Sequence, residues 1–357
     1  MENGFNQGYA LLIGVSDQGD PSLTKYQLPQ VENDVKALKK VLLDPSLCGY
    51  LNENVTVLLG KDATKQNIIN EMGNLLTKLS ESNEPDVTVL IYFSGHGFLH
   101  PTDIEAGFRL IPYDAASPRN PIKFKNSTIA DQEWAEIVAE IQPERLLLIM
   151  DCCHAGATQA KDGSENESTP PPPPTDEEKK KKEKPTDEKA QPAGSKPIPI
   201  LPPGSPMRWD KLKGGNARVV LQSCQDHQQS WIKGNMSIFT QHLIEGLMGH
   251  GHSGSEDQTT VSVLSLMEYL SQKVPATAKS IGQEQHPFHT YNGGTFPIAL
   301  LAGGKGLGGQ QPPTIEEKIG ELPAIQIGNI NTANIQGDSN ILIQDANNSN
   351  ISINQGK

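Results

Sequence analysis

The sequence contains few cysteines, and none of them lies in a pattern that suggests a disulfide framework. Only four occur in 357 residues, two of them adjacent at Cys152 and Cys153, and no CxxC pair is present. Adjacent cysteines rarely form a disulfide without strain. The sequence therefore favours a reducing compartment, in which a thiol serves chemistry or packing.

The sequence also lacks the patterns of targeting and membrane-spanning segments. Residues 1–9 are polar and have neither the basic nor the apolar region of a signal peptide. No apolar run approaches the roughly 20 residues that cross a bilayer. We therefore expect a cytoplasmic protein with no membrane partner.

Basic charge is scarce relative to acidic charge. The chain has 30 Lys and Arg against 42 Asp and Glu, which gives a formal net charge of -12. Such a chain repels phosphate, so we expect no nucleic-acid partner and substrates that carry basic residues. Apolar residues make up only 35% of the chain, and part of it is therefore expected to lack a core.

Composition divides the chain into five regions. Residues 1–156 and 208–302 are predicted to form the two halves of a folded unit. Residues 157–207 form a linker rich in Pro, Lys and Glu that contains 12 of the 27 prolines, and we expect it to be disordered. Residues 303–323 are a Gly/Pro-rich linker, and residues 324–357 are a tail rich in Asn and Ile.

The folded regions alternate continuous apolar runs with helical patterns. Strands are expected at 9–15, 55–59, 87–93, 146–150 and 218–223. Helices are expected after a cap at Asn33 or Asp34, after a cap at Thr64, and over 128–141, 238–248 and 262–272. Strands that are apolar throughout and separated by helices predict an α/β fold with a mostly parallel central sheet and helices on both faces.

Two motifs follow the ends of predicted strands. One contains His96 followed by Gly97, and the other contains Asp151 and Cys153. The carboxyl ends of parallel strands meet at one edge of a sheet, so the histidine and the cysteine are expected to lie together. A thiol attacks a carbonyl as thiolate, and an imidazole can take its proton. The backbone N–H groups of Gly97 and Cys153 are predicted to bind the oxyanion.

Taken singly, each motif has a simpler interpretation. A lone Gly-His-Gly is usually a turn, and a Cys-Cys pair is usually buried packing. A zinc site formed by Cys152, Cys153 and His154 is a further alternative, although adjacent cysteines do not match the spaced ligands of structural zinc sites. The occurrence of both motifs at successive strand ends favours the catalytic interpretation.

The motifs together resemble the caspase-like cysteine peptidases of clan CD, peptidase family C14, and in particular the metacaspases. The resemblance rests on residues 9–14, 92–97, 110–114, 151–156 and 223–228. It implies a three-layer α/β sandwich and aligns Cys153 with the nucleophile of the D-x-C-H-S-G motif, with alanine in place of the usual serine at position 155. The 57-residue separation of His96 and Cys153 is similar to the caspase spacing of about 50.

The resemblance also implies a substrate class. Asp151 and Asp226 take the places of the acidic pocket of metacaspases, and Ser223 begins the second-subunit motif, so these three residues are predicted to bind substrate. Carboxylates in a pocket favour arginine or lysine before the cleaved bond. No cofactor is expected; some metacaspases depend on calcium, but no EF-hand-like loop occurs here. The alternatives are a catalytically silent scaffold and an acyl hydrolase with the same dyad.

The tail resembles short amyloid signalling motifs. Residues 325–331 look like the core of a RHIM-type motif, and an S-N-I-x-I segment occurs twice, ten residues apart, from Ser339 and Ser349. Proline-free, Ile- and Asn-rich segments suit cross-β stacking. This resemblance implies homo-oligomers or filaments, an upstream sensor with a similar motif, clustering that activates self-cleavage, and a role in bacterial defence or cell death. A disordered tail or a β-solenoid cap is the alternative.

Overall fold

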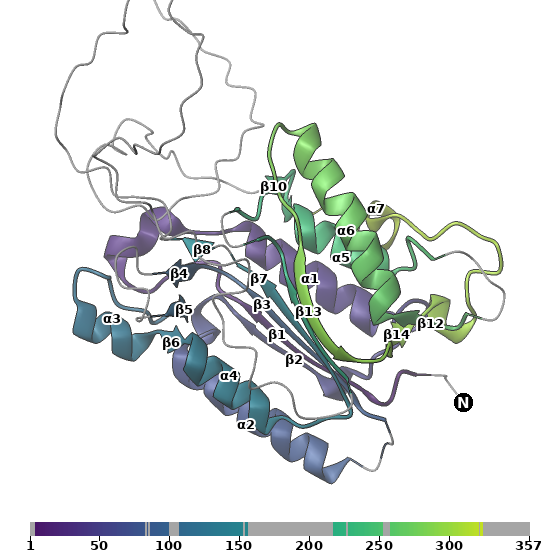
Figure 1. The fold of residues 1–357 in the computed structure, drawn as a ribbon, viewed down its shortest axis with the longest axis horizontal. Coiled ribbons are helices and arrows are strands. Elements are labelled where there is room, and N and C mark those ends of the chain that lie inside the picture. Colours follow the sequence, from purple (N-terminus) through teal and green to yellow (C-terminus); the bar gives the residue numbers. More distant parts are fainter. Residues whose placement is uncertain are drawn as a thin grey trace, which may run out of the picture.

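A six-stranded sheet forms the centre of the molecule (Figure 1). The computed structural model describes residues 4–82, 84, 86–99, 107–152, 154–155, 217–225, 228–252, 258–320 and 322–323. In spatial order the strands are β13 (Phe288–Gly293), β9 (Ala217–Gln222), β7 (Arg145–Asp151), β3 (Thr88–Ser94), β1 (Gly8–Gly14) and β2 (Val55–Leu59). All neighbouring pairs are parallel except β13 with β9.

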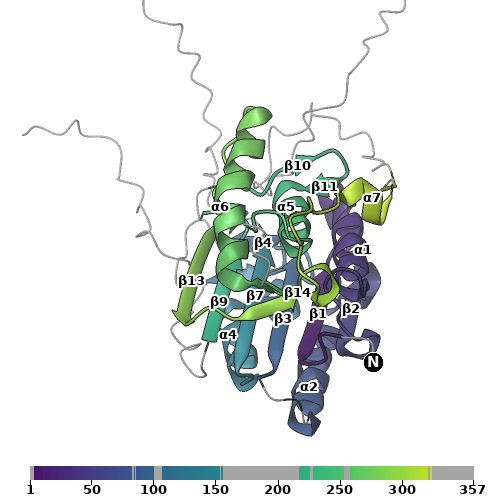
Figure 2. The same ribbon diagram turned by 90° about the vertical axis from the view of Figure 1, so that its right-hand side faces the viewer.

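Helices cover both faces of this sheet (Figure 1, Figure 2). One face carries α2 (Lys65–Glu81) and α4 (Asp131–Glu140), and the other carries α1 (Gln30–Leu43), α5 (Ile238–Leu247) and α6 (Val263–Ser280). The predicted three-layer α/β fold with a mostly parallel sheet is therefore confirmed.

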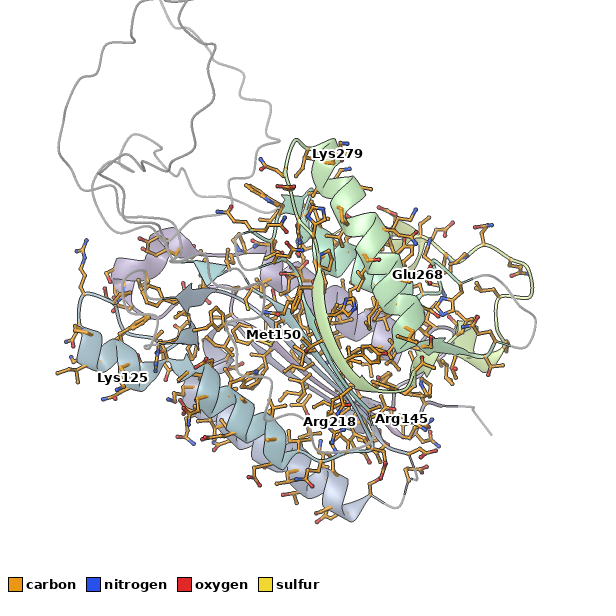
Figure 3. The ribbon with its side chains drawn as sticks, in the orientation of Figure 1. Lys125, Arg145, Met150, Arg218, Glu268 and Lys279 are labelled. Carbon is orange, nitrogen blue, oxygen red and sulfur yellow. The ribbon has the colours of Figure 1, made fainter. Side chains whose placement is uncertain are left out.

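Apolar side chains on the two faces of each strand pack into two separate hydrophobic cores. Leu12 of β1 packs in the cluster that contains Leu38 of α1, and its neighbour Ile13 packs in the cluster that contains Ile68 of α2. Every residue of β3 is buried. Figure 3 shows Met150 inside the molecule, with charged side chains such as that of Lys125 on the outer surface. Continuous apolar strands are required because both faces are covered.

Smaller sheets surround the central one. Beyond the carboxyl ends of β3 and β7, a four-stranded sheet has the order β6 (Ile129–Ala130), β5 (Phe108–Leu110), β4 (Gly97–Leu99) and β8 (His154–Ala155), and α3 (Pro121–Ser127) precedes β6. Two further pairs are β10 (Ile232–Lys233) with β11 (Met236–Ser237), and β12 (Thr260–Ser262) with β14 (Pro297–Leu300). The chain thus passes from β3 into β4 and from β7 into β8 at the same edge.

The predicted helix caps have different outcomes. The Thr64 side chain accepts a hydrogen bond from the Asn67 N–H, as expected for a cap of α2. The cap expected at Asn33 or Asp34 is wrong, because α1 already begins at Gln30 after Pro29 and has no side-chain cap. The side chains of Asn33 and Asp34 instead bond to segments far away in the sequence.

Part of the region predicted as a Gly/Pro-rich linker packs on the domain. Gly303, with a φ of 63°, donates its N–H to the Leu47 carbonyl at 2.9 Å. A side chain there would collide with the Pro45 carbonyl, so glycine is needed for this close approach. The short helix α7 (Ile315–Ile319) follows, with Ile315 buried.

We call residues 314–320 with 322 and 323 the C-terminal strap. The Ile319 carbonyl accepts from Lys40 Nζ at 3.2 Å, and the Pro323 carbonyl accepts from Asn33 Nδ2 at 3.1 Å. Both donors belong to α1, so the strap is fastened along that helix. The predicted linker 157–207 and the tail 324–357 lie outside the described residues.

Candidate active site

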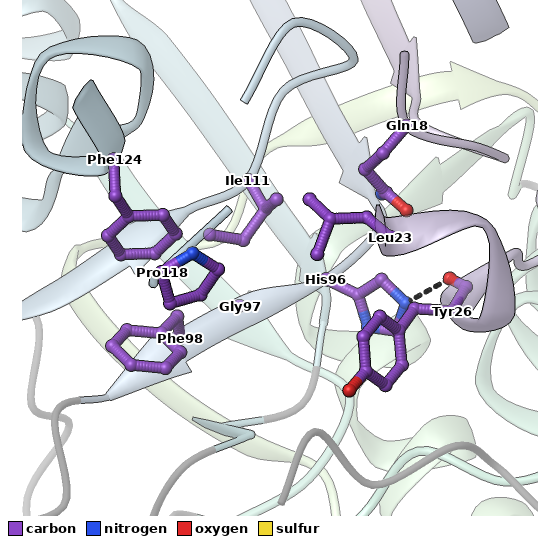
Figure 4. Close-up of a pocket in the computed structure, with 9 residues that line it drawn as sticks. All are labelled: Gln18, Leu23, Tyr26, His96, Gly97, Phe98, Ile111, Pro118 and Phe124. Atoms are coloured by element: carbon purple, nitrogen blue, oxygen red, sulfur yellow. Dashed lines mark hydrogen bonds between the residues drawn. The ribbon is translucent and has the colours of Figure 1, made fainter. Parts of the chain in front are cut away.

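His96 lies in the connection between β3 and β4, at the carboxyl edge of the sheet. Its Nε2 is 2.6 Å from the backbone carbonyl oxygen of Tyr26, and the Tyr26 ring packs edge-on at 6.5 Å (Figure 4). A carbonyl oxygen can only accept, so Nε2 carries the hydrogen and donates it. In the neutral ring Nδ1 is then the nitrogen that can accept a proton.

Burial sets the protonation state of His96. The residue is 8% exposed, and burial lowers the pKa of its imidazole from 6.5, while the hydrogen bond to Tyr26 acts in the opposite direction. Desolvation disfavours the charged ring. His96 is therefore neutral at pH 7 and can act as a base.

Strand register is defined for residues that lie close to Cys153 in the sequence. Asp151 in β7 pairs with Ser94 in β3, and His154 in β8 pairs with Gly97 in β4. Cys153 and its side chain lie outside the described residues. Asp151, two residues before Cys153, and His154, the residue after it, thus pair with Ser94 and Gly97, which enclose the segment containing His96. The roles of Gly97 and Cys153 in binding an oxyanion stay predictions.

A cavity beside His96 holds two buried carboxylates. Its walls include His96, Cys152, Asp151 and Asp34. Asp151 and Asp34 are 5% and 0% exposed, respectively. We call it the acidic cavity. Asp151 was predicted from the sequence to belong to a substrate pocket, and the structure places it in this wall.

The carboxylate of Asp151 is held by two hydroxyl groups. Ser230 Oγ donates to Oδ1 at 2.7 Å, and Thr240 Oγ1 donates to Oδ2 at 2.8 Å. Tyr92 lies 2.7 Å from Thr240 Oγ1 and donates to it, because the threonine proton is already used. Three segments of the chain, in β3, before β10 and in α5, therefore fix the orientation of Asp151.

Asp34 is a site residue that the sequence analysis assigned only to a helix cap. Its Oδ1 accepts from the Ser237 backbone N–H at 3.0 Å, and its buried Oδ2 has no hydrogen-bond partner. Burial, and then the charge of Asp151, raise the pKa of Asp34 well above its ordinary value. An unpaired carboxylate oxygen in a cavity is suited to a cationic guest.

The sequence does contain a pattern that indicates burial of Asp34. The residue falls on the apolar stripe of α1, between Val31 and Leu38 at helical spacing. A carboxylate there cannot face solvent unless the apolar side chains do so too. It must be buried, and a buried carboxylate needs a partner or a function.

The remaining predicted substrate residues are placed differently. Ser223 is fully buried after β9, where its carbonyl accepts from Gln285 Nε2 at 3.0 Å. The same Gln285 Nε2 lies 3.3 Å from Ser230 Oγ, which connects Ser223 indirectly to Asp151. Asp226 lies outside the described residues. Substrate binding by Ser223 and Asp226 stays a prediction.

Two further properties concern the described part of the chain only. No group of three or more His, Cys, Asp or Glu side chains within it could hold a metal ion. No helix within it is long and apolar enough to cross a membrane. The zinc alternative included Cys153, which lies outside that part.

Comparison with known proteins identifies the family to which the chain belongs. A protein from Geobacter sulfurreducens has a solved structure with 16% identity and a TM-score of 0.47, covering 80% of this chain and 94% of its own. Caspase-1 from Spodoptera frugiperda has 17% identity and a TM-score of 0.40, covering 85% and 92%. No curated protein sequence matches. The model of the caspase domain, peptidase family C14, matches residues 7–297, and the chain therefore belongs to the caspase domain family.

Proposed function

We propose that this chain is a cysteine endopeptidase that cleaves after arginine or lysine, with Cys153 as nucleophile and His96 as base. The observation that carries the proposal is His96, oriented by the Tyr26 carbonyl, in the wall of a cavity with two buried carboxylates. Membership of the caspase domain family supports peptidase chemistry. A cleavage profile on a diverse peptide library tests it, with cutting after Arg or Lys as the expected result.

The reaction runs through a thioester. The Cys153 thiol proton passes to His96 Nδ1, and the thiolate attacks the carbonyl carbon of the substrate. The C–N bond breaks as the imidazolium donates its proton to the leaving amine. Water then gives a proton to the imidazole, and its oxygen attacks the thioester. The C–S bond breaks, and the sulfur regains a proton.

The acidic cavity supports the choice of basic substrates. Asp34 Oδ2 has no hydrogen-bond partner, so it can accept from the ammonium or guanidinium of a substrate. Asp151 is oriented beside it by Ser230 and Thr240. A substrate aspartate would meet the charge of Asp151 there and would be repelled.

The lowered pKa of His96 predicts the pH dependence of thiol reactivity. Alkylation of Cys153 by iodoacetamide, which is uncharged and does not need the acidic cavity, should lose rate at low pH with an apparent pKa below 6.5. The sign follows because burial keeps the imidazole neutral as the pH falls through 6.5, so the base is lost only below that value. Mass spectrometry of the labelled peptide measures the rate at each pH.

The matched variant for this measurement is His96→Ala. Without the imidazole, the alkylation midpoint should move up toward about 8.5, the ordinary value of a cysteine thiol. A wild-type midpoint at or above 6.5, or equal midpoints in the two proteins, would show that His96 does not act on Cys153.

Self-cleavage within residues 157–207 is expected. Lys179–Lys182 and Lys184 offer basic residues in a segment whose composition suits entry into a cleft as an extended strand. The two fragments should stay together, because β7 and β9, on either side of that segment, pair in parallel from Arg145 to Met150. Mass spectrometry should place the new termini after lysine between residues 161 and 196. An active enzyme that always remains one chain would refute this.

Assembly through residues 324–357 is the last part of the proposal. The isolated tail peptide should form fibrils with a cross-β spacing of about 4.7 Å, and the double variant Ile341→Pro, Ile343→Pro should not, because proline cannot join the ladder. Assembly should raise self-cleavage by concentrating catalytic domains, with a sensor carrying a similar motif as the natural trigger. Full self-cleavage by dilute protein truncated at Gly309 would exclude this activation mechanism.

A further inference from the structure

A second hollow shares His96 as a wall, beyond the acidic cavity (Figure 4). It measures about 330 Å³ together with its open mouth. Its lining is mainly apolar and includes Leu23, Phe98, Ile111 and Phe124. The acidic cavity is lined by Ser94 at the end of β3 and by Gly95 and His96 after it, whereas this hollow is lined by His96 and by Gly97 and Phe98 of β4.

The apolar wall of the hollow is separate from the two cores of the domain. Ile111 and Phe124 form a small cluster of their own with Ala115, and Phe98 packs against it. The rings of Phe98 and Phe124 meet edge to face with centroids 5.0 Å apart. The Ile111 N–H donates to the His96 carbonyl at 3.1 Å. The wall is therefore fixed relative to His96.

One polar side chain at the hollow is buried without a partner. Gln18 is 5% exposed, and neither its Oε1 nor its Nε2 makes a hydrogen bond. Its loop is held on both sides, by Val15 N–H to the Ser94 carbonyl at 2.8 Å and by Gly19 N–H to the Tyr113 carbonyl at 2.7 Å. An unsatisfied buried amide destabilises the fold. A carboxamide offers one donor group and one acceptor, the same pair that a peptide unit presents.

The chemistry of cleavage decides which part of a substrate lies here. If the residue before the cleaved bond fills the acidic cavity, the imidazole of His96 must reach the nitrogen on the other side of that bond. The residue that owns this nitrogen then lies beyond His96, where the apolar hollow opens.

We propose that this hollow binds the side chain of the residue after the cleaved bond, that it selects a large apolar residue such as leucine, and that Gln18 hydrogen-bonds the adjacent substrate backbone. This inference rests on the proposed function. It adds a second determinant of specificity, so that the enzyme selects a basic residue before the cleaved bond and an apolar residue after it.

Two kinds of substrate separate this inference from the proposed function. A peptidyl-Arg aminocoumarin carries an aromatic amine in place of a residue after the cleaved bond, so it reports cleavage without a substrate backbone that Gln18 could bind. Internally quenched peptides with Arg-Leu, Arg-Gly or Arg-Asp at the cleaved bond report the hollow. We expect kcat/KM for Arg-Leu to exceed that for Arg-Gly about 10-fold or more, the range for burying a few methylenes, and Arg-Asp to be cut most slowly.

Gln18→Leu, a variant of similar size, tests the backbone contact. It should lower kcat/KM for the quenched peptides by about 5-fold or more relative to kcat/KM for the coumarin substrate. Its melting temperature should not fall, because two unpaired buried polar atoms are removed. Gln66→Leu, on the exposed surface of α2, is the matched control and should leave both activities unchanged.

Equal cleavage of Arg-Leu and Arg-Gly peptides by an enzyme that cuts the coumarin would overturn the apolar subsite. An unchanged ratio of peptide to coumarin cleavage in Gln18→Leu would overturn the role of the carboxamide. No cleavage of the coumarin by processed enzyme would overturn the proposed function and this inference with it.

Discussion

Replacing Cys153 with alanine is expected to abolish cleavage of peptides at arginine and lysine, a loss of roughly 10³-fold or more in kcat/KM. Cys152→Ala should retain most of the activity. Cys152 is buried in the wall of the acidic cavity, whereas Cys153 is the sulfur that the D-x-C-H-S-G register aligns with the nucleophile. Initial rates with a peptidyl-Arg substrate, on variants of equal thermal stability, measure the difference.

Further arms of this experiment address the alternatives. His96→Ala should also be inactive, because the thiol loses its base. Inactive Cys152→Ala with active Cys153→Ala would show that the other sulfur is the nucleophile. A folded wild-type protein that cuts no peptide and is not labelled by a thiol-reactive peptide would be a scaffold. One that hydrolyses simple thioesters but no peptides would be an acyl hydrolase.

Asp34→Asn is expected to remove most of the preference for basic residues. The asparagine Oδ1 can still accept from the Ser237 N–H, so the local structure is kept, but the unpaired oxygen that a cationic guest would ionise is replaced by an amide that cannot carry a negative charge. The loss should be about 1–3 kcal/mol in transition-state binding of Arg substrates, or roughly 5- to 150-fold in kcat/KM. Asp226→Asn measures the predicted contribution of Asp226 in the same assay.

A matched control lies at the opposite end of the same sheet. Asp86 precedes β3 and forms an exposed ion pair with Arg145 at 3.0 Å. Asp86→Asn makes the same chemical change, and we expect little effect because exposed ion pairs contribute little. Wild-type preference for cleavage after aspartate, or an Asp34→Asn enzyme with unaltered selectivity for arginine, would contradict the assignment of the acidic cavity.

Local sequence pattern was sufficient to place the candidate site at one edge of the sheet. His96 and Asp151 each follow a continuous apolar run, and runs of that kind become parallel strands that end together. The fold class followed from the same runs. These inferences need only neighbours in sequence, which explains why they were accessible.

Residues whose roles depend on distant contacts were not accessible in this way. Asp34 is paired with Ser237, which is 203 residues further along the chain, so its place just before the apolar positions that start at Val35 suggested a cap instead. Gln18 lies in a loop with no periodic pattern. The helix expected over 262–272 continues as α6 to Ser280, past Pro275, because Val274 and Ala278 still pack in the core.

The C-terminal strap sets the length of the tether between the caspase domain and any partner that binds residues after 323. A free chain of the length of residues 303–323 would let the two wander roughly 25 Å apart. Fastening to Lys40 and Asn33 removes that freedom, so the exit point is fixed beside α1. Asn33 also donates to the Asn235 carbonyl at 2.9 Å, next to the hairpin that positions Asp34. A force that pulls on residues after 323 would therefore act first on α1, the helix that contributes Asp34 to the acidic cavity.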